Sequence, residues 1–577
     1  MASERSLGLL SDNAVPPFGR TRSAPRSRRG CWTCRSPQVK KRCDESRPTC
    51  GRCARRNLSC DYSIRLSLAQ RRRGETAVYD LNNTPSSDPT SDTASPGRRI
   101  SLRKRGPSQN LELEPIVHQE PSLTVIRLAA PSVSVCSLAL TDNDHESIRY
   151  FRSVFAKFHH TKNPDYSLFS IMFDIAQEDP MVMHMVILLG LREMDFRRPN
   201  QQRRNPTQHY ASALRLLADA ISPDNESQDI DAIYTALWLM LLYEQQFGDP
   251  GCKAYTNHLT GAASLLQHRG QNLLQFPSSS ASRSEKAPVL LRKAQGSTLS
   301  VYSARIIVWI SLLDAAAASS GVGGQVNGTL FSLLLNNAGA SRSISPVQAF
   351  SRLHRYSNPL YRQNWGDSYP QPELLDDVEN RNIYALLGQC GQLRFIVAQL
   401  AVLYRKDTAA AAVKAQDVDS SIEHVGEIFT ELMEVASDLS PNTDNSHRLV
   451  ANIRAIVPMY HAIVLDFLRI SAFDQPLGDR QRHALREILE LAYQSFKHDG
   501  DEAMIRVAWP LFIAALETDE SLQRDWVLDR FAAISKYGKN FERAHRFLRG
   551  AISAQQRLGI RIELHACMEQ AEQFVLV

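Results

Sequence analysis

The chain has 577 residues, which is long enough for one small module and one or two large domains with their own hydrophobic cores. A chain of this length needs no disulfides in place of a core, so its ten cysteines are not expected to be structural bridges. No charged-then-apolar leader is visible, and the longest apolar runs, 181–191 and 236–243, are shorter than the roughly 18 residues of a membrane span. We therefore expect a soluble intracellular protein with no membrane partner, in which clustered cysteines bind metal.

Positive charge is concentrated near the N-terminus. Residues 20–73 contain seventeen Arg or Lys and three acids, a balance of +14, whereas the whole chain has a net charge of +6. A basic segment on a mildly acidic remainder predicts a polyanionic partner. A solvated basic tail would explain the charges before residue 30, but not the cysteines that follow.

Six of the ten cysteines lie within residues 30–60. Their spacing is C-x2-C-x8-C-x6-C-x2-C-x6-C, formed by Cys31, Cys34, Cys43, Cys50, Cys53 and Cys60. A structural zinc ion takes four ligands, so six thiolates serve one ion with two left over, or two ions if two sulfurs are shared. Two Zn2+ and six thiolates carry a net charge of about −2, which nearby Arg and Lys can stabilise, and metal binding would supply most of the folding free energy of so small a module.

The segment Gly30–Cys60 resembles the fungal zinc binuclear cluster (Zn2Cys6) DNA-binding domain. The resemblance is carried by G-C-W-T-C at 30–34, C-D-E at 43–45 and P-T-C-x-x-C at 48–53. It implies two zinc ions that share Cys31 and Cys50. Cys34 and Cys43 would complete the first ligand set, and Cys53 and Cys60 the second.

One interval departs from this family. Eight residues, 35–42, separate the second and third cysteines, where the family usually has six. Cysteines seven apart share a helix face, whereas cysteines nine apart lie on opposite faces, so two residues must loop out. Ser36 and Pro37 suit a cap and first turn, which predicts a helix that begins later than usual and runs through Val39–Arg42. An error in the coding sequence would also explain the two extra residues.

The register of this interval determines which residue reads bases. Counted from Cys43, the family's base-reading position falls on Lys40, with Lys41 and Arg42 close behind; counted from Cys34, it falls on Pro37 and Gln38. We favour Lys40, because proline has no donor for guanine. The other basic residues are expected to hold phosphates: Arg35, Arg52, Arg55 and Arg56. The resemblance implies CGG-like triplets, and the absence of apolar heptads from 61 to 114 leaves open whether the protein acts as a monomer or a homodimer.

Residues 66–120 are rich in Pro, Ser, Thr and Asp and predict a flexible linker with basic clusters. The run RRISLRKR at 98–105 is interpreted as part of a nuclear import signal, the alternative being a solvated basic patch. The expected location is the nucleus.

From about residue 121 the pattern predicts a large all-α domain, with strand-like alternation only at 122–140. Asp179 with Pro180, and Asp229, are predicted helix starts. The predicted helices fall at about 148–158, 180–196, 207–221, 229–243, 254–268, 302–318, 378–404, 418–437, 447–470, 479–496, 501–517, 521–535 and 539–574.

Residues 209–221 and 229–270 resemble the helical fungal-specific transcription factor domain, a resemblance that extends from about 144 to the C-terminus and implies regulatory work. No H-E-x-x-H, phosphate loop or G-x-S-x-G is present, so no catalytic residues are predicted. His184 is interpreted as a satisfied core residue rather than a ligand. Asn358–Asp377 is interpreted as a connector that packs its aromatics, rather than a binding loop.

The predicted organisation is a disordered basic tail (1–26), a Zn2Cys6 DNA-binding domain (27–65), the linker (66–120) and an all-helical regulatory domain (121–577). The predicted function is sequence-specific DNA binding in the nucleus, which regulates RNA polymerase II genes through the transcription machinery. The alternatives are a zinc-bearing adaptor or scaffold that binds protein or RNA, and an enzyme with an accessory zinc module.

Overall fold

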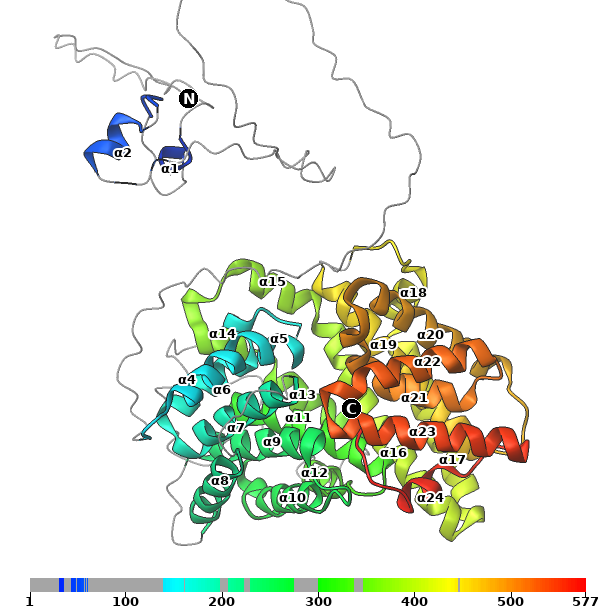
Figure 1. Ribbon diagram of the computed structural model, residues 1–577. Coiled ribbons are helices and arrows are strands. Elements are labelled where there is room, and N and C mark those ends of the chain that lie inside the picture. The colour runs from blue at the N-terminus through cyan, green and yellow to red at the C-terminus, as the bar shows by residue number, and fades with distance from the viewer. Residues whose placement is uncertain are drawn as a thin grey trace, which may run out of the picture. The chain divides into compact units, whose positions relative to one another are not determined.

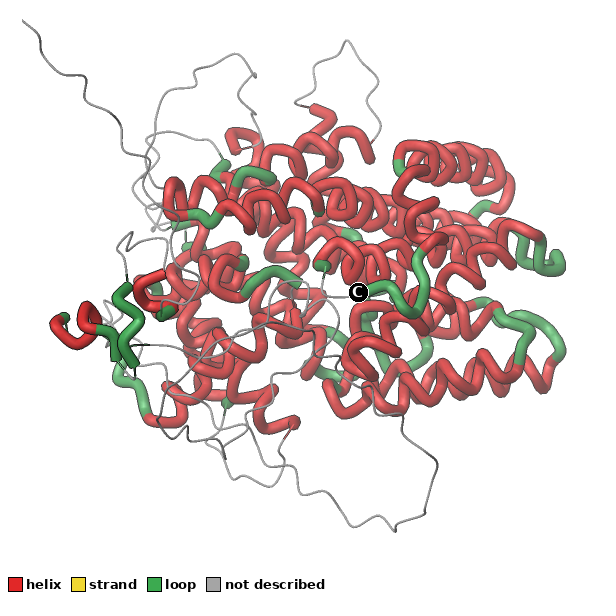
Figure 2. The backbone as a smooth tube through the Cα atoms, turned by 90° about the horizontal axis from the view of Figure 1, so that it is seen from above, coloured by secondary structure: helices red, strands yellow, loops and turns green. Residues whose placement is uncertain are grey.

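The computed structural model describes residues 31–35, 43–47, 49–56, 58, 60, 138–159, 161–197, 206–222, 229–273, 299–336, 346–444 and 447–577. The chain divides into two compact units between Ser122 and Leu123, and each unit is described by itself (Figure 1). Every regular element in these ranges is helical and none is a strand, which confirms the mainly α prediction (Figure 2). The predicted tail 1–26 and the linker 66–120 lie outside the described residues, as does 122–137 of the strand-like segment, while 138–140 form a loop.

In the first unit, two short helices begin within the two C-x2-C pairs and contain the second cysteine of each: α1 (Trp32–Arg35) and α2 (Gly51–Arg55). Its buried core consists of four cysteines, Cys31, Cys34, Cys50 and Cys53, against which Cys43 and Cys60 pack. Because no aliphatic or aromatic side chain belongs to this core among the described residues, sulfur alone fills it.

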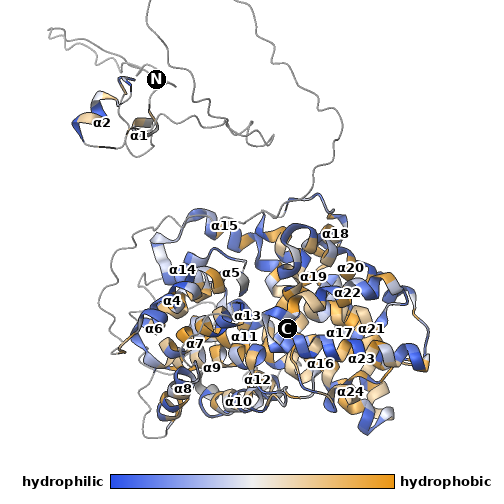
Figure 3. Ribbon diagram, viewed as in Figure 1, coloured by the Kyte–Doolittle hydropathy of each residue, from blue (hydrophilic) through white to orange (hydrophobic). Residues whose placement is uncertain are grey.

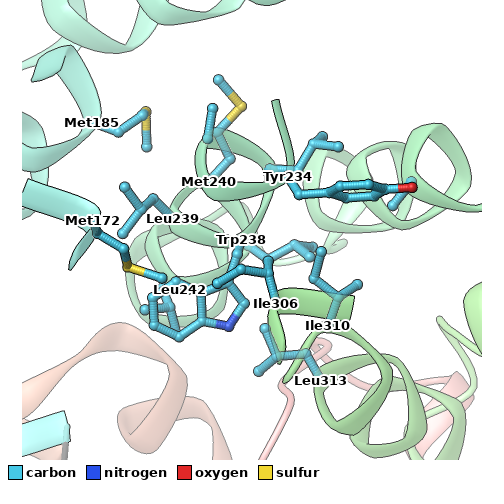
Figure 4. Close-up of a cluster of buried hydrophobic side chains, with 14 of the residues drawn as sticks. Met172, Met185, Tyr234, Trp238, Leu239, Met240, Leu242, Ile306, Ile310 and Leu313 are labelled. Atoms are coloured by element: carbon cyan, nitrogen blue, oxygen red, sulfur yellow. The ribbon is translucent and has the colours of Figure 1, made fainter. Parts of the chain in front are cut away.

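The second unit begins with helices whose apolar faces meet in one core. They are α4 (Asp142–Tyr150), a π-helical turn η1 (Phe151–Phe155), α5 (Ala156–His159), η2 (Pro164–Tyr166), α6 (Leu168–Glu178), α7 (Pro180–Arg197), α8 (Thr207–Ala220), α9 (Ile230–Phe247), α10 (Lys253–Leu273), α11 (Val301–Ser319), α12 (Gln325–Asn336), α13 (Pro346–Ser357), α14 (Leu360–Trp365), η4 (Gly366–Ser368) and α15 (Gln371–Glu379). In Figure 4, Trp238 of α9 lies among Met172 of α6 and Ile310 and Leu313 of α11.

A second core is built by the remaining helices. These are α16 (Arg381–Lys406), α17 (Thr408–Ile428), α18 (Thr430–Asp438), α19 (Arg448–Ser471), α20 (Asp479–Asp499), η5 (Gly500–Val507), α21 (Ala508–Glu517), α22 (Ser521–Ile534), η6 (Ser535–Tyr537), α23 (Lys539–Leu558) and α24 (Leu564–Glu569). Apolar residues from these helices are buried against one another, whereas outward faces are polar (Figure 3). A buried ion pair, Arg469 with Glu517, ties α19 to the end of α21.

The C-terminal segment connects the two cores. Phe574 and Leu576 belong to the second core and Val575 to the first. The Asn540 side chain donates to the Val575 carbonyl and accepts from the Val575 N–H, both at 2.8 Å. The segment 572–577 therefore acts as a strap between helices far apart in sequence.

Two helices of the described chain have the length and apolar composition of a membrane span, α11 and α16. Within the most apolar stretch of each, 78% of α11 and 67% of α16 is buried inside the protein. Both helices pack against each other, and α16 also packs against α19. Helices buried to this extent are typical of the core of a helical domain.

Two predicted helix starts are confirmed. Asp229 caps α9, its carboxylate accepting from the Asp231 N–H at 2.9 Å, and Pro180 opens α7 while the Asp179 carboxylate accepts from the Val182 N–H at 3.1 Å. Each arrangement satisfies a backbone N–H that the helix itself leaves unpaired.

Other predicted boundaries are wrong. The helix predicted at 501–517 is a 3-10 segment followed by α21, and the helix predicted at 539–574 ends at Leu558, where Gly559 takes a left-handed φ of 68°. Five helices were not predicted: α6, α12 and α13, and also α14 and α15, which lie largely within the segment 358–377 interpreted as a connector.

Candidate metal centre and nucleic-acid interface

The structure brings all six N-terminal cysteines together as two overlapping groups of four. One group contains Cys31, Cys34, Cys43 and Cys50, and the other contains Cys31, Cys50, Cys53 and Cys60. Within each group the sulfur atoms all lie within 4.8 Å of one another. Cys31 and Cys50 belong to both groups.

The sulfur separations suit a tetrahedral metal. Cys31 Sγ lies 3.8 Å from both Cys50 Sγ and Cys53 Sγ, and 3.9 Å from Cys43 Sγ, while Cys34 Sγ lies 3.7 Å from Cys50 Sγ. A tetrahedral zinc with Zn–S bonds of about 2.3 Å requires an S···S separation of about 3.8 Å. A disulfide would need about 2.05 Å, and all six cysteines are free thiols.

Local backbone geometry aims these sulfurs inward. Cys31 Sγ accepts from the Cys34 N–H at 3.4 Å, and Cys50 Sγ accepts from the Cys53 N–H at 3.4 Å, so each C-x2-C pair forms the first turn of a helix around its first sulfur. Cys60 Sγ accepts from the Cys50 N–H at 3.3 Å. Such N–H donors stabilise thiolates and fix their direction.

This turn explains a wrong prediction. The first helix begins at Trp32 rather than after Ser36, because the Cys31 sulfur already caps it. Residues 36–42 lie outside the described residues, so the predicted helix through Val39–Arg42 lies there too.

Asp44 holds the two halves of the module together, a role that the sequence analysis missed. Its carboxylate accepts from the Gly51 N–H at 2.8 Å, at the start of α2, and a Cβ on Gly51 would lie only 2.6 Å from Asp44 Oδ2. Glu45, in the left-handed region at φ 62°, donates its N–H to Cys43 Sγ at 3.4 Å. The signal available in the sequence was an acid just after a ligand cysteine and a glycine opening the next helix.

The thiols differ in how readily they ionise. Burial raises the pKa of Cys53 to about 12, whereas for Cys50 burial is outweighed by hydrogen bonds from the Cys53 N–H and neighbouring thiols, which lower the pKa to about 6. A divalent cation bound to these sulfurs would favour the thiolate form of the buried Cys53.

Three of the predicted DNA-contacting residues have described side chains. Arg52 is half-buried and donates from Nη1 to Cys34 Sγ at 3.6 Å, so its charge faces the cluster. Arg55 and Arg56 are exposed at the end of α2. Arg35 ends α1 but its side chain is not described, and Lys40, Lys41 and Arg42 lie outside the described residues.

Histidines and the remaining cysteines of the helical unit do not form a comparable cluster among the described residues. His184 Nδ1 lies 3.0 Å from His209 Nδ1, and His209 pairs with Asp144, which confirms that His184 is satisfied within the fold. Cys252 and Cys390 are buried and Cys567 is half-buried.

The sequence matches two known families. The Fungal Zn(2)-Cys(6) binuclear cluster domain matches residues 29–68, and the Fungal specific transcription factor domain matches residues 147–551. Both matches fall on the segments whose residues suggested these resemblances.

Curated proteins match mainly short segments. The thiamine biosynthesis regulatory protein of Saccharomyces cerevisiae is 45% identical over 64 residues, 11% of this chain and 12% of that protein. The cercosporin biosynthesis regulatory protein CTB8 of Cercospora beticola is 34% identical over 86 residues, 15% of this chain and 21% of that protein. The sterol uptake control protein 2 of Candida albicans is 39% identical over 61 residues, 9% of this chain and 8% of that protein. The chain thus aligns with between 8% and 21% of the length of these three relatives, and no solved structure matches it.

Proposed function

Because the chain belongs to the family of fungal transcription regulators that carry a zinc cluster, we propose that it binds double-stranded DNA sequence-specifically through its six-cysteine module. The family is one of transcription factors and not of enzymes, which confirms the prediction that the chain is not an enzyme. The proposed domains are 27–65 for DNA binding and 121–577 for regulation, joined by the linker 66–120 and preceded by the basic tail 1–26.

The six cysteines would hold two zinc ions. Cys31 and Cys50 would serve both ions, Cys34 and Cys43 would complete the first set of four ligands, and Cys53 and Cys60 would complete the second. The observation that carries this proposal is the pair of overlapping four-sulfur groups that share Cys31 and Cys50. Four ligands per ion, with two shared, is the arrangement that satisfies two tetrahedral ions with six thiolates.

Zinc here supplies folding free energy, and the chain's own residues supply the DNA contacts. Two Zn2+ and six thiolates leave a net charge of about −2, toward which the Arg52 guanidinium is directed. The remaining basic residues of 20–73 are then available to phosphates. Such a surface attracts DNA of any sequence and makes binding strongly salt-dependent.

Lys40, with Lys41 and Arg42 beside it, contacts the bases of CGG-like triplets. A lysine or arginine at a helix end donates to guanine N7 and O6 in the major groove. Arg35, Arg55 and Arg56 hold the phosphate backbone, and the exposure of Arg55 and Arg56 supports this assignment. Arg52, for which the same role was predicted, donates to the Cys34 sulfur instead. The protein acts in the nucleus on RNA polymerase II genes and engages the transcription machinery; a homodimer would read two triplets.

The test is fluorescence anisotropy of the full-length zinc-loaded chain with a CGG-containing duplex and with a scrambled duplex. We expect tight binding of the first, a preference that persists at physiological salt, and loss of binding with a chelator. Lys40→Gln is expected to reduce the preference about tenfold or more, whereas Arg55→Gln weakens both duplexes alike. Equal binding to both duplexes, or preferred binding to single-stranded RNA or to a protein, would support the adaptor alternative.

A further inference from the structure

We propose that the helical unit binds an amphipathic organic anion, with a carboxylate or phosphate head group at Arg305 and an apolar body against Trp309 and Leu387. These residues line a cavity of about 550 Å3 in the helical unit. Its wall combines residues of α11, α13, α14 and α15 with residues of α16 and α19, which belong to the second core. This volume falls within the range of small-molecule sites.

The charge of the wall is strongly positive. Five arginines line the cavity, against one acid: Arg305, Arg355, Arg362, Arg381 and Arg448 against Asp377. Asp377 is already engaged, since its Oδ1 accepts from Lys162 Nζ at 2.6 Å and lies 3.4 Å from Arg448 Nη1. Its charge is therefore offset by Lys162 and Arg448. Arg448 is itself paired with Asp376 as well as Asp377, so the excess positive charge of the wall comes from the other four arginines, and it favours an anionic ligand.

Arg305 is the residue that most requires such a ligand. It is only 9% exposed, and its Nη2 donates to the Ser357 carbonyl at 3.0 Å and to Asn358 Oδ1 at 3.3 Å. Its Nε is buried without a hydrogen-bond partner, and among the described residues no carboxylate forms an ion pair with this guanidinium. Burial lowers the pKa of Arg305, although the nearby Asp377 acts in the opposite direction. An anion in the cavity would supply the missing acceptor, because a buried charge is favourable only when it is paired.

Apolar side chains adjoin the arginines in this cavity. Trp309, Leu312 and Leu387 line it, and the same three residues, with Tyr384, also line a second cavity of about 250 Å3. The wall of the second cavity combines the apolar residues Trp238, Leu242, Ile456 and Met459 with two further arginines, Arg394 and Arg506, and it has no acidic side chain. The indole Nε1 of Trp238 is buried there without a hydrogen-bond partner. A ligand with one charged end could place that end at the arginines and its apolar body against Trp309, Leu312 and Leu387.

The connector 358–377 contributes to both packing and the cavity. The rings of Trp365 and Tyr369 stack with their centroids 5.8 Å apart, as the connector interpretation predicts. Asn358, Pro359 and Arg362 of the same segment nevertheless line the cavity. The two interpretations of this segment, connector and binding loop, are therefore compatible.

Isothermal titration calorimetry on the full-length zinc-loaded chain tests the site with four probes: decanoate, decyl phosphate, decanol and inorganic phosphate. We expect one decanoate or decyl phosphate per chain, with decanol and inorganic phosphate at least tenfold weaker. Whichever of the two amphiphiles binds more tightly identifies the head group. If decanol binds as tightly as decanoate, the head-group charge does not contribute to binding. If inorganic phosphate binds as tightly as decyl phosphate, the apolar wall does not contribute. Either result, or the absence of amphiphile binding, would overturn the proposal.

Substitutions locate the site. Arg305→Met keeps the apolar length of the side chain and should weaken amphiphile binding at least tenfold. Arg352→Met is the matched control, because it changes an exposed arginine of α13 that does not line the cavity, and it should leave affinity unchanged. Arg381→Gln changes an exposed rim residue without disturbing the core and should weaken binding severalfold, which keeps the test decisive if Arg305→Met fails to fold. Unchanged affinity in both Arg305→Met and Arg381→Gln would overturn the assignment. The result is independent of the proposed DNA binding, since zinc content and DNA affinity are measured separately.

Discussion

The cysteine module and the helical unit are held together by different interactions. In the module, the buried core among the described residues consists of cysteines alone, and hydrogen bonds to sulfur direct its two short helices. In the helical unit, apolar faces build two cores that the C-terminal strap joins. The comparison sets a module whose described core consists of cysteines placed to hold a metal against a unit stabilised by packed apolar side chains and a few buried polar contacts.

The largest expected effect is on the module. Cys50→Ser removes a sulfur that both four-cysteine groups share, so both metal sites should be lost together with DNA binding, because structural zinc contributes about 10–16 kcal/mol to folding. Zinc content and anisotropy with a CGG-containing duplex measure the loss. Cys567→Ser, outside the module, is the control and should retain both properties; loss of one ion alone in Cys50→Ser would contradict a shared ligand.

A large effect confined to the helical unit is expected at Glu517. Its side chain is fully buried and pairs with Arg469 and Arg561, so Glu517→Ala leaves buried cations uncompensated and should lower the free energy of unfolding by about 3–5 kcal/mol. Urea unfolding followed by circular dichroism measures it. Glu427→Ala changes a carboxylate whose side chain is 79% exposed and should alter the free energy by less than about 0.5 kcal/mol. Loss of zinc from Glu517→Ala would show that the units are not separable.

A substitution that releases the C-terminal strap, 572–577, is expected to lower the free energy of unfolding by a smaller amount. Asn540→Ala removes both hydrogen bonds to Val575 and should cost about 1–3 kcal/mol of unfolding free energy. The exposed Asn382→Ala, on α16, serves as the control. Thermal unfolding of the two variants in parallel is sufficient, and equal midpoints would mean that the strap contributes little.

The smallest expected effect is a pH dependence. Burial, and then the neighbouring His483, lower the pKa of His461 to about 3, below the roughly 6.5 of an unfolded histidine. As pH falls below 6.5 the unfolded chain takes up this proton first, so stability present at higher pH is lost down to about pH 3. Between pH 6.5 and 5.5 this residue contributes about 1.0 kcal/mol of the change in unfolding free energy. His461→Gln should reduce the slope of urea stability against pH by that amount, and an identical slope in wild type and variant would refute the assignment.

Features formed by residues close together in the chain could be predicted from the sequence. The six cysteines and their spacing lie within 31 residues, so the sequence alone led to the two four-sulfur groups that the structure places together. Asp229 and Pro180 were predictable helix starts for the same reason, since a cap acts on N–H groups two or three residues away.

Features made by distant residues were not predictable. The cavity joins Arg305 to Arg381 and Arg448, which the fold brings together from three helices and which no spacing rule connects. Asp44 escaped notice because its partner, Gly51, offers only a backbone N–H. The start of α1 at Trp32 depends on a sulfur acting as a cap, whereas the sequence offered Ser36 as the ordinary capping residue.

Native mass spectrometry of the full-length chain, isolated under reducing conditions with zinc, tests the central claim most directly. Two zinc ions per chain are predicted, falling to none after replacement of Cys31 and Cys50 by Ser. A single ion per chain, or a metal-free chain that takes up no zinc, would contradict the shared cluster and with it the proposed DNA-binding module.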